Sequence, residues 1–263
     1  MEMFVVDKRG YGSFDSGGGL HTASGPDQFR SSLSVTYGLT GQLSVQTVPA
    51  IYHARDAGVD YTGVGDLPLK LKYRFHEGRA GLFHPSFTTA WGVTLPTGDY
   101  QRLRSVKSGF GSGVYGGTGQ LSMQSAFVAW DHPSRLRMWV TVTAPLTSVT
   151  VHDISSYGTA PGFVGRALPG ATAQLGIGDE FALSQHWVVD LDLVEDFSRS
   201  AHLHGAAVTG PLATTHGRSM SLAPAVEYNF SQQLGLIAGA EISMMGRNAN
   251  ALVIPQLALN THF

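Results

Sequence analysis

The sequence predicts an all-β protein, an up-and-down antiparallel transmembrane β-barrel of twelve strands. Three observations support this fold class. Segments of alternating apolar and polar residues recur along the whole chain. The connections between these segments alternate between short and long, and aromatic residues gather near the short connections. Residues 1–263 are expected to form this single barrel domain, because all-β barrels of this length are common.

The segment GDLPLKLKYRF, residues 65–75, shows the alternation most clearly. Its odd positions from Leu67 to Phe75 are apolar, and Lys70, Lys72 and Arg74 lie between them. In a strand every second side chain shares a face, whereas a helix would scatter the three cations over more than half of its circumference. The segment is therefore predicted as a strand with an apolar face toward lipid and a basic face toward a lumen.

Similar segments follow one another with no amphipathic helix between them. We place strands near residues 2–13, 28–38, 41–53, 65–76, 82–96, 117–130, 135–149, 171–184, 186–199, 217–230, 233–246 and 252–263. The face opposite the apolar one carries polar or small residues rather than a second core. Two residues, Asp179 and Glu195, depart from this rule, because each falls on the apolar face of its strand; a β-bulge or a position beyond the bilayer would explain either.

The connections alternate in length. Those after the even-numbered strands are short: LTGQ, HEGRAG, DHPSR, SQH and SQQ. Those after the odd-numbered strands are mostly long and rich in Gly and Ser, the last, RNANA, being shorter. Short periplasmic turns and long extracellular loops are typical of outer-membrane barrels, and closure satisfies every backbone group in lipid. The predicted location is therefore the bacterial outer membrane; a soluble barrel or sandwich is the alternative.

Composition excludes several classes of protein. The chain has 17 Lys+Arg against 19 Asp+Glu, so charge gives no reason to expect a nucleic-acid partner. It has no Cys, which excludes disulfides, thiol catalysis and thiolate metal sites. No apolar run approaches the roughly 18 to 20 residues of a membrane helix. The start, MEMFVVDKRG, has no signal-peptide pattern, so an exported form is expected to have lost its signal.

Three short motifs carry a resemblance to a known family. They are Tyr37-Gly38-Leu39-Thr40, then Gly65-Asp66 with Lys70 and Tyr73, and finally Leu95-Pro96-Thr97-Gly98-Asp99. In this order and spacing the chain resembles the outer-membrane family named after the MetA pathway of phenol degradation. The resemblance implies an outer-membrane barrel that transports hydrophobic or aromatic compounds, and it implies no catalytic residue.

Charged residues on the polar faces are the candidate site, and we expect them to line the lumen. They are Lys70, Lys72, Arg74, Arg135, Arg137, Glu180, Asp190, Asp192, Glu227 and Glu241. Asp190 and Asp192 are expected to compensate Arg135 and Arg137, which would leave the three cations of residues 70–74 freer. Such residues could form a selectivity filter or a salt-bridged network that stiffens the barrel, and the sequence leaves both open.

Other chemistry finds little support. His202, His204 and His216 share one connection but have no carboxylate triad near them, so neither a metal site nor a cofactor is expected. The run from His152 to Ser155 lacks a nucleophile motif, and the glycine-rich segment 109–119 lacks the P-loop lysine. We therefore expect no enzyme.

The sequence thus favours a passive channel for small solutes, hydrophobic or aromatic ones among them. The alternative is a non-transporting anchor or scaffold that binds other envelope proteins through its loops and turns. In either case the expected partners include outer-membrane lipids and lipopolysaccharide.

Overall fold

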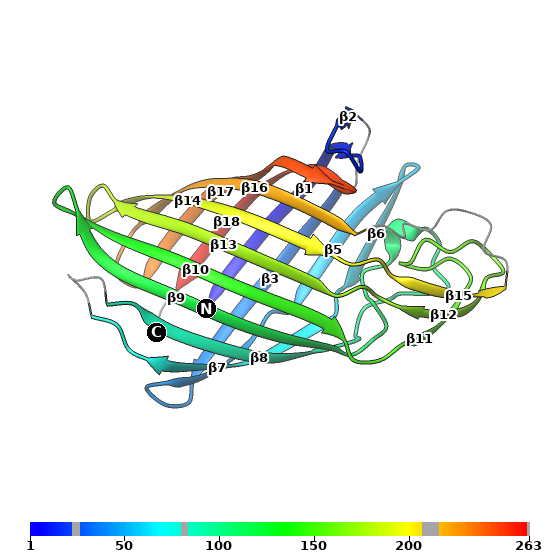
Figure 1. Ribbon diagram of the computed structural model, residues 1–263, viewed down its shortest axis with the longest axis horizontal. Helices are drawn as coiled ribbons and strands as arrows, with labels where there is room; N and C mark the ends of the chain where they lie inside the picture. Colours follow the sequence, from blue (N-terminus) through cyan, green and yellow to red (C-terminus); the bar gives the residue numbers. More distant parts are fainter. Residues whose placement is uncertain (23–26, 80–83, 207–215, 262–263) are drawn as a thin grey trace.

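The structure is a computed structural model that describes residues 1–22, 27–79, 84–206 and 216–261. It is a closed, twelve-stranded antiparallel barrel, which confirms the predicted fold class (Figure 1). The wall is formed in chain order by β1 (Glu2–Phe14), β3 (Asp27–Gly38), β4 (Leu43–Thr47) continued by β5 (Ala50–Asp56), β6 (Val59–Val64) continued by β7 (Leu67–His76), β8 (Ser86–Leu95), β9 (Gly116–Ala129), β10 (His132–Pro145), β13 (Thr172–Ala182), β14 (Trp187–Ser198), β16 (Gly217–Asn229), β17 (Leu234–Arg247) and β18 (Ala249–Thr261).

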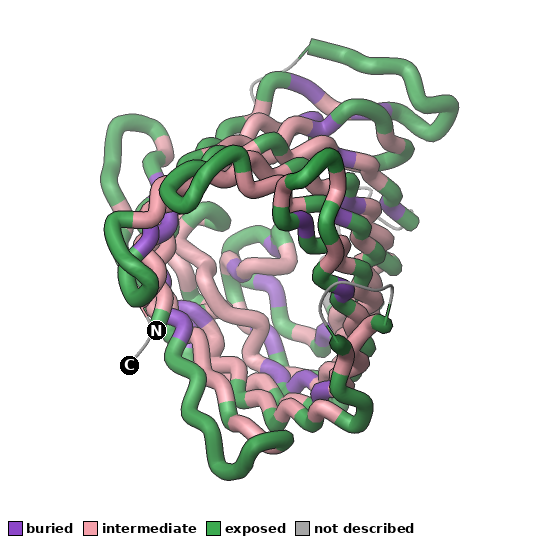
Figure 2. Tube along the Cα trace, turned by 90° about the vertical axis from the view of Figure 1, so that its left-hand side faces the viewer, coloured by how far each residue is buried: buried purple, intermediate pink, exposed green. Residues whose placement is uncertain are grey.

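The two ends of the chain close the barrel. β1 pairs with β18 on one side and with β3 on the other, both antiparallel. The amino group of Met1 donates a hydrogen bond to the carbonyl oxygen of Thr261 at 2.7 Å. Figure 2 shows the strands as a ring with both termini close together. Among the described residues, closure leaves no strand edge in the wall, as a β-sheet in lipid requires.

The outer face of the barrel is apolar, as the alternation predicted. In β7 the side chains of Leu69, Leu71 and Phe75 are 40%, 39% and 48% exposed, whereas Lys70 and Lys72 between them are half-buried. Exposed apolar residues continue around the wall, for example Leu191 on β14. A band of apolar side chains that face outward is the surface expected against hydrocarbon, so the barrel is an outer-membrane protein. In the described residues, no helix has the length and hydropathy needed to span a bilayer.

Two of the predicted strand boundaries were wrong near the start of the chain. Segment 41–53 is not one strand but β4 and β5, which are separated at Pro49, whose ring nitrogen cannot donate to a ladder. The next segment, predicted as a long loop, instead extends β5 into a hairpin with β6. Its two-residue turn, Ala57-Gly58, has φ angles of 48° and 82°, the left-handed region that such hairpin turns use.

Two other connections are shorter than predicted. β9 and β10 are joined by Trp130 and Asp131 alone, with φ angles of 47° and 65°, so the turn predicted at 131–134 is displaced. β17 and β18 are joined by the single residue Asn248, at φ 46°, so β18 begins three residues before the predicted position 252. In both places the turn residues adopt positive φ angles, which apolar alternation alone does not reveal.

The long connections fold into a second structure at one end of the barrel. β11 (Val149–His152), β12 (Val164–Leu168) and β15 (His202–Ala206) form a separate three-stranded sheet where loops were predicted. Its buried centre consists of Val151, Phe163 and Ala167. We call residues 98–115 and 149–168, together with β15, the cap; it lies to the right in Figure 1, away from the short turns. The connection between β1 and β3 contains β2 (Leu20–Thr22). The connection between β8 and β9, which belongs to the cap, contains a 3-10 helix at Val106–Ser108.

Asp66 ties the cap to the barrel. Its carboxylate accepts hydrogen bonds from the backbone N–H of Gly98 at 3.0 Å, and from the N–H and hydroxyl of Ser112 at 2.8 and 2.6 Å. The hydroxyl of Tyr157 donates to the carbonyl oxygen of Ser112. Phe110 stacks on Tyr52 of β5 with ring centroids 5.6 Å apart. The motifs around Asp66 and Gly98 therefore have a structural task, which is to hold segment 98–115 at the barrel mouth.

Candidate functional site

The candidate site is the barrel interior near the short turns. Its charged side chains come from strands whose alternate residues face outward, so the register fixes which of them point inward. Arg135, Arg137, Glu180, Asp190 and Asp192 form one connected group, which we call the arginine network. It spans three neighbouring strands, β10, β13 and β14.

Arg137 is the centre of the arginine network. Its Nη2 donates to the Oδ2 of Asp190 at 2.9 Å and to the Oδ1 of Asp192 at 3.0 Å, and its Nε lies 3.0 Å from the Oε1 of Glu180. Arg135 pairs with Glu180 and not with the two aspartates, so the predicted compensation is met for Arg137 and is wrong for Arg135. Three carboxylates around one half-buried guanidinium form a fixed electrostatic unit.

Glycine makes this arrangement possible. Gly178 lies between Arg137 and Asp192 in the sheet register, and a Cβ atom there would come within 1.6 Å of the Oδ1 of Asp192. Gly176, two residues earlier, is covered by the indole ring of Trp139 in the same way. The indole Nε1 donates to the Oε1 of Gln174 at 2.9 Å. Because Gly176 and Gly178 of β13 have no side chains, Trp139 and the arginine network can lie flat against the wall.

The basic residues of β7 have a different environment. Lys70 and Lys72 make no salt bridge within the described part of the chain, as predicted. Arg74 differs from the prediction, because its Nη2 lies 3.4 Å from the Oε1 of Glu77 and donates to the carbonyl oxygen of Gly41 at 2.8 Å. Arg74 is therefore fixed at the turn end of the barrel. Neither lysine forms an ion pair within the described residues, although Glu2 lies within electrostatic range of Lys72.

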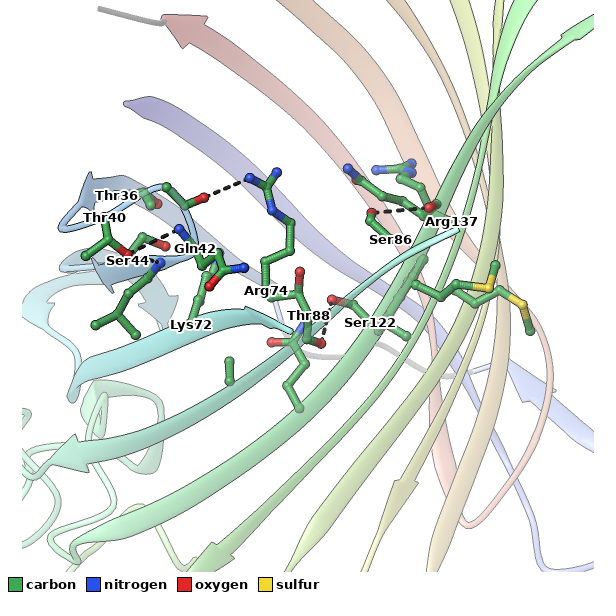
Figure 3. Close-up of a pocket in the computed structure, with 18 residues that line it drawn as sticks. Thr36, Thr40, Gln42, Ser44, Lys72, Arg74, Ser86, Thr88, Ser122 and Arg137 are labelled. Carbon is green, nitrogen blue, oxygen red and sulfur yellow. Dashed lines mark hydrogen bonds between the residues drawn. The ribbon is translucent and has the colours of Figure 1, made fainter. Parts of the chain in front are cut away.

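A cavity of about 460 Å³ opens beside these cations (Figure 3). Its charged lining residues are Lys72, Arg74 and Arg137, and none of the described residues that line it is Asp or Glu. The rest of the lining is mainly hydroxyl and amide groups, together with Trp139 and a few apolar side chains. The hydroxyl and amide residues are Thr36, Thr40, Gln42, Ser44, Ser86, Thr88, Gln120, Ser122 and Gln124. Cations among neutral donors are suited to holding an anion rather than a cation.

Several charged residues of the interior were not predicted from the sequence. Lys8 on β1 lies within electrostatic range of Glu241 and Asp196, and Glu2 lies within range of Lys72 and Arg137. The sequence predicts a strand near residues 2–13, but the run Asp7-Lys8-Arg9 hides which of its charges face inward. The burial of alternate residues distinguishes the inward-facing charges of β1, and this burial is known only from the structure.

The remaining two predicted residues lie elsewhere on the acidic side. Glu227 on β16 is within electrostatic range of Glu180, Arg135 and Arg137. Glu241 on β17 lies with Lys8 and Asp196. The structure therefore brings Glu227 close to the arginine network and leaves Glu241 in a separate group, whose other members, Lys8 and Asp196, were not among the predicted residues.

The cap gives no support to a catalytic site. Ser155 is fully buried, and its hydroxyl accepts a hydrogen bond from the Thr159 hydroxyl at 2.7 Å, so it is not exposed as a nucleophile would be. In the second sheet Arg166 lies directly across from His204, and a cation at that position opposes metal binding. No group of three metal-ligating side chains occurs among the described residues. His216 lies outside the sheet that carries the other two histidines.

Comparisons with known proteins identify the class of fold. The chain is similar to the COG4313 outer membrane channel from Pseudomonas putida F1, with a TM-score of 0.70 and 14% identity over 100% of this chain and 94% of that one. It is also similar to the transport unit of the autotransporter AIDA-I from Escherichia coli, with a TM-score of 0.58 and 10% identity over 100% and 90% of the two chains. For the NanC porin the TM-score is 0.54 at 7% identity, over 99% and 100%.

These likenesses show the fold of an outer-membrane β-barrel. No family model matches the chain, and no curated protein matches its sequence. The resemblance to the MetA-pathway family therefore stays a prediction.

Proposed function

We propose that this protein is an outer-membrane channel for the passive diffusion of small solutes, and that its lumen favours anions. The observation that carries this proposal is the cavity beside β7, where Lys72, Arg74 and Arg137 are the charged lining residues. A low-dielectric wall concentrates the field of such charges in the space between them. Carboxylates, including those of hydrophobic or aromatic acids, have the charge that this cavity would attract.

The two walls of the lumen have separate tasks in this proposal. The carboxylates of the arginine network are engaged by Arg135 and Arg137, which removes much of their field from the pathway. Lys70 and Lys72 are not engaged in this way. In this proposal Arg135, Glu180, Asp190 and Asp192 stiffen the wall, and Lys70 and Lys72 select solutes. Arg137 does both, because it holds the network and also lines the cavity.

Single-channel recording in planar bilayers tests the proposal. In a KCl gradient the wild type should show a reversal potential of the sign expected for anion preference. Replacing Lys70, Lys72 and Arg74 by Gln should shift this potential toward cation preference. A matched control is Arg55→Gln, because Arg55 is an exposed cation on the outer side of β5.

The rival is a non-transporting scaffold, and the ordered cap with its own buried centre favours it. In this case the arginine network would be structural and the cap would bind other envelope proteins. A wild type that conducts nothing, even after segment 99–111 is shortened, would support the scaffold and contradict the channel.

Orientation can be tested separately. The proposal places the short turns in the periplasm and the cap outside the cell. The chain has no Cys, so a single cysteine reports its own location. Ser16→Cys, exposed at the cap end, should react with a membrane-impermeant maleimide on intact cells, and Gln232→Cys, exposed at a short turn, should not. The opposite pattern would reverse the orientation.

A further inference from the structure

Two arginines face outward side by side at the cap end of the barrel wall. Arg218 on β16 pairs directly with Arg247 on β17, and residues that pair across strands share a face. Two residues further along β16, Met220 pairs with Met245, which is 56% exposed on the outer surface. The two guanidinium groups therefore lie on the lipid side of the barrel and not in its lumen.

In the described part of the chain, the protein around this pair balances only one of its two charges. Like charges directly opposite each other destabilise a sheet. Within the described residues one carboxylate, that of Glu195, contacts the pair, and it accepts a hydrogen bond from the Nε of Arg218. The guanidinium of Arg218 also lies 5.6 Å from the ring centroid of Phe197, which restricts its position. A guanidinium has five N–H donors, so Arg218 and Arg247 together have many donors left for an anion.

An apolar groove runs along the wall below the arginines. It has a volume of about 520 Å³, and Leu121, Val140, Leu175, Ile177 and Leu193 are among its lining residues. Glu195 and Met220, the outward-facing pair next to Arg218, line it as well. The groove and the arginines therefore form one continuous surface, apolar below and cationic above.

The height of the arginines matches the surface of a bilayer. β16 runs from Gly217 to Asn229. A strand tilted near 45° rises about 2.3 Å per residue along the barrel axis, so Arg218 lies about 25 Å above the turn end. About 25 Å is also the height of the apolar band of such barrels, which places Arg218 where lipid headgroups begin.

We propose that Arg218 and Arg247 bind the phosphate of a phosphorylated lipid, and that an acyl chain of this lipid lies in the groove. Arginine binds phosphate through paired N–H···O contacts, which gives both charge and geometric complementarity. The groove offers apolar contact to the chain below. In the orientation proposed above, this lipid belongs to the outer leaflet. The site is independent of the lumen, so it stands whether or not the barrel conducts.

Native mass spectrometry of the delipidated protein in a non-ionic detergent tests this site, with diphosphoryl lipid A as the probe. The wild type should bind one lipid A molecule more tightly than any others. Arg218→Gln with Arg247→Gln should weaken this binding about tenfold or more, because hydrogen bonds between charged groups are lost. Replacing both arginines by Lys should restore part of the affinity, and the control Arg55→Gln should leave it unchanged.

Two further measurements separate the headgroup from the chain. Leu193→Trp, which fills the groove, should weaken lipid A binding without changing the heat-modifiable gel mobility of the folded barrel. Inorganic phosphate at millimolar concentration should compete poorly. If phosphate displaced lipid A readily, the arginines would bind a free anion and the lipid site would be wrong. Equal lipid A binding by the wild type and the double Gln variant would also overturn it. If the double variant fails to fold, Arg247→Gln alone should still weaken binding severalfold.

Discussion

The barrel and the cap are held together by different kinds of interaction. The barrel is one closed ladder of backbone hydrogen bonds, and its apolar side chains face outward. The cap has a short three-stranded sheet and a small buried centre around Val151, and hydrogen bonds from its backbone to the carboxylate of Asp66 tie it to the wall. A change in the wall thus acts on the whole molecule through lipid contact and closure, whereas a change in the cap should act locally.

The largest effect is expected on the outer face of the wall. Leu191→Arg places a charge among exposed apolar side chains on β14 and should lower the free energy of unfolding by about 2 to 4 kcal/mol in lipid vesicles. Urea titration followed by tryptophan fluorescence measures this change. Thr141→Arg is the matched control, because Thr141 faces the lumen, and it should cost clearly less. Equal costs would mean that the register of β10 or β14 is misassigned.

A smaller loss is expected when the arginine network loses its centre. Arg137→Met leaves Asp190, Asp192 and Glu180 close together without their shared cation. Breaking a buried ion pair costs about 3 to 5 kcal/mol, and because Arg137 is partly exposed we expect about 2 to 3 kcal/mol in the same urea titration.

Lys70→Met is the comparison within the lumen, since Lys70 has no salt-bridge partner among the described residues. It should change the stability little. If Arg137→Met proved as harmless as Lys70→Met, the network would not stiffen the barrel, and its residues would be free to act on solutes.

The wall was predictable from the sequence because lipid outside and polar groups inside impose a period of two. Leu69, Lys70, Leu71 and Lys72 record this period directly, and their burial in the structure follows it. The cap carries no such period. Its residues Gly98 and Ser112 bond to Asp66 of the wall, 32 and 46 positions away, and the sequence does not reveal contacts of this kind.

The candidate site was predictable only in part, for a related reason. Alternation identified which charges share a face, and so it found Arg137, Asp190 and Asp192. It could not tell which of them would meet, because this depends on the register between strands and on the space that Gly178 leaves. Arg74 was expected to be free and is paired with Glu77, a residue assigned to the turn.

Where the cap meets the wall, Asp66→Ala should have a moderate and local effect. It removes the acceptor of three hydrogen bonds from Gly98 and Ser112 and leaves two half-buried backbone N–H groups without a partner. The expected cost is about 1 to 2 kcal/mol for the ordering of segment 98–115. Hydrogen exchange should become faster in this segment and stay unchanged in β13 and β14. Faster exchange throughout the barrel would show that the cap and the wall unfold together.

The smallest effect is expected at the connection between β1 and β2, beside the cap end. Hydrogen bonds from His21, Gly19 and Gly17 lower the pKa of the exposed Asp15 carboxyl from 3.8 to about 2. A depressed pKa stabilises the folded turn above about pH 3.8, and this contribution is lost as the pH falls toward 2. Carboxyl carbon NMR of the labelled protein should show an inflection near pH 2 that is absent in Asp15→Asn. In His21→Ala the inflection should move upward, because the first of these hydrogen bonds is gone. An unchanged inflection would assign the lowered pKa to the two glycine N–H groups, and the turn would then be held by its backbone alone.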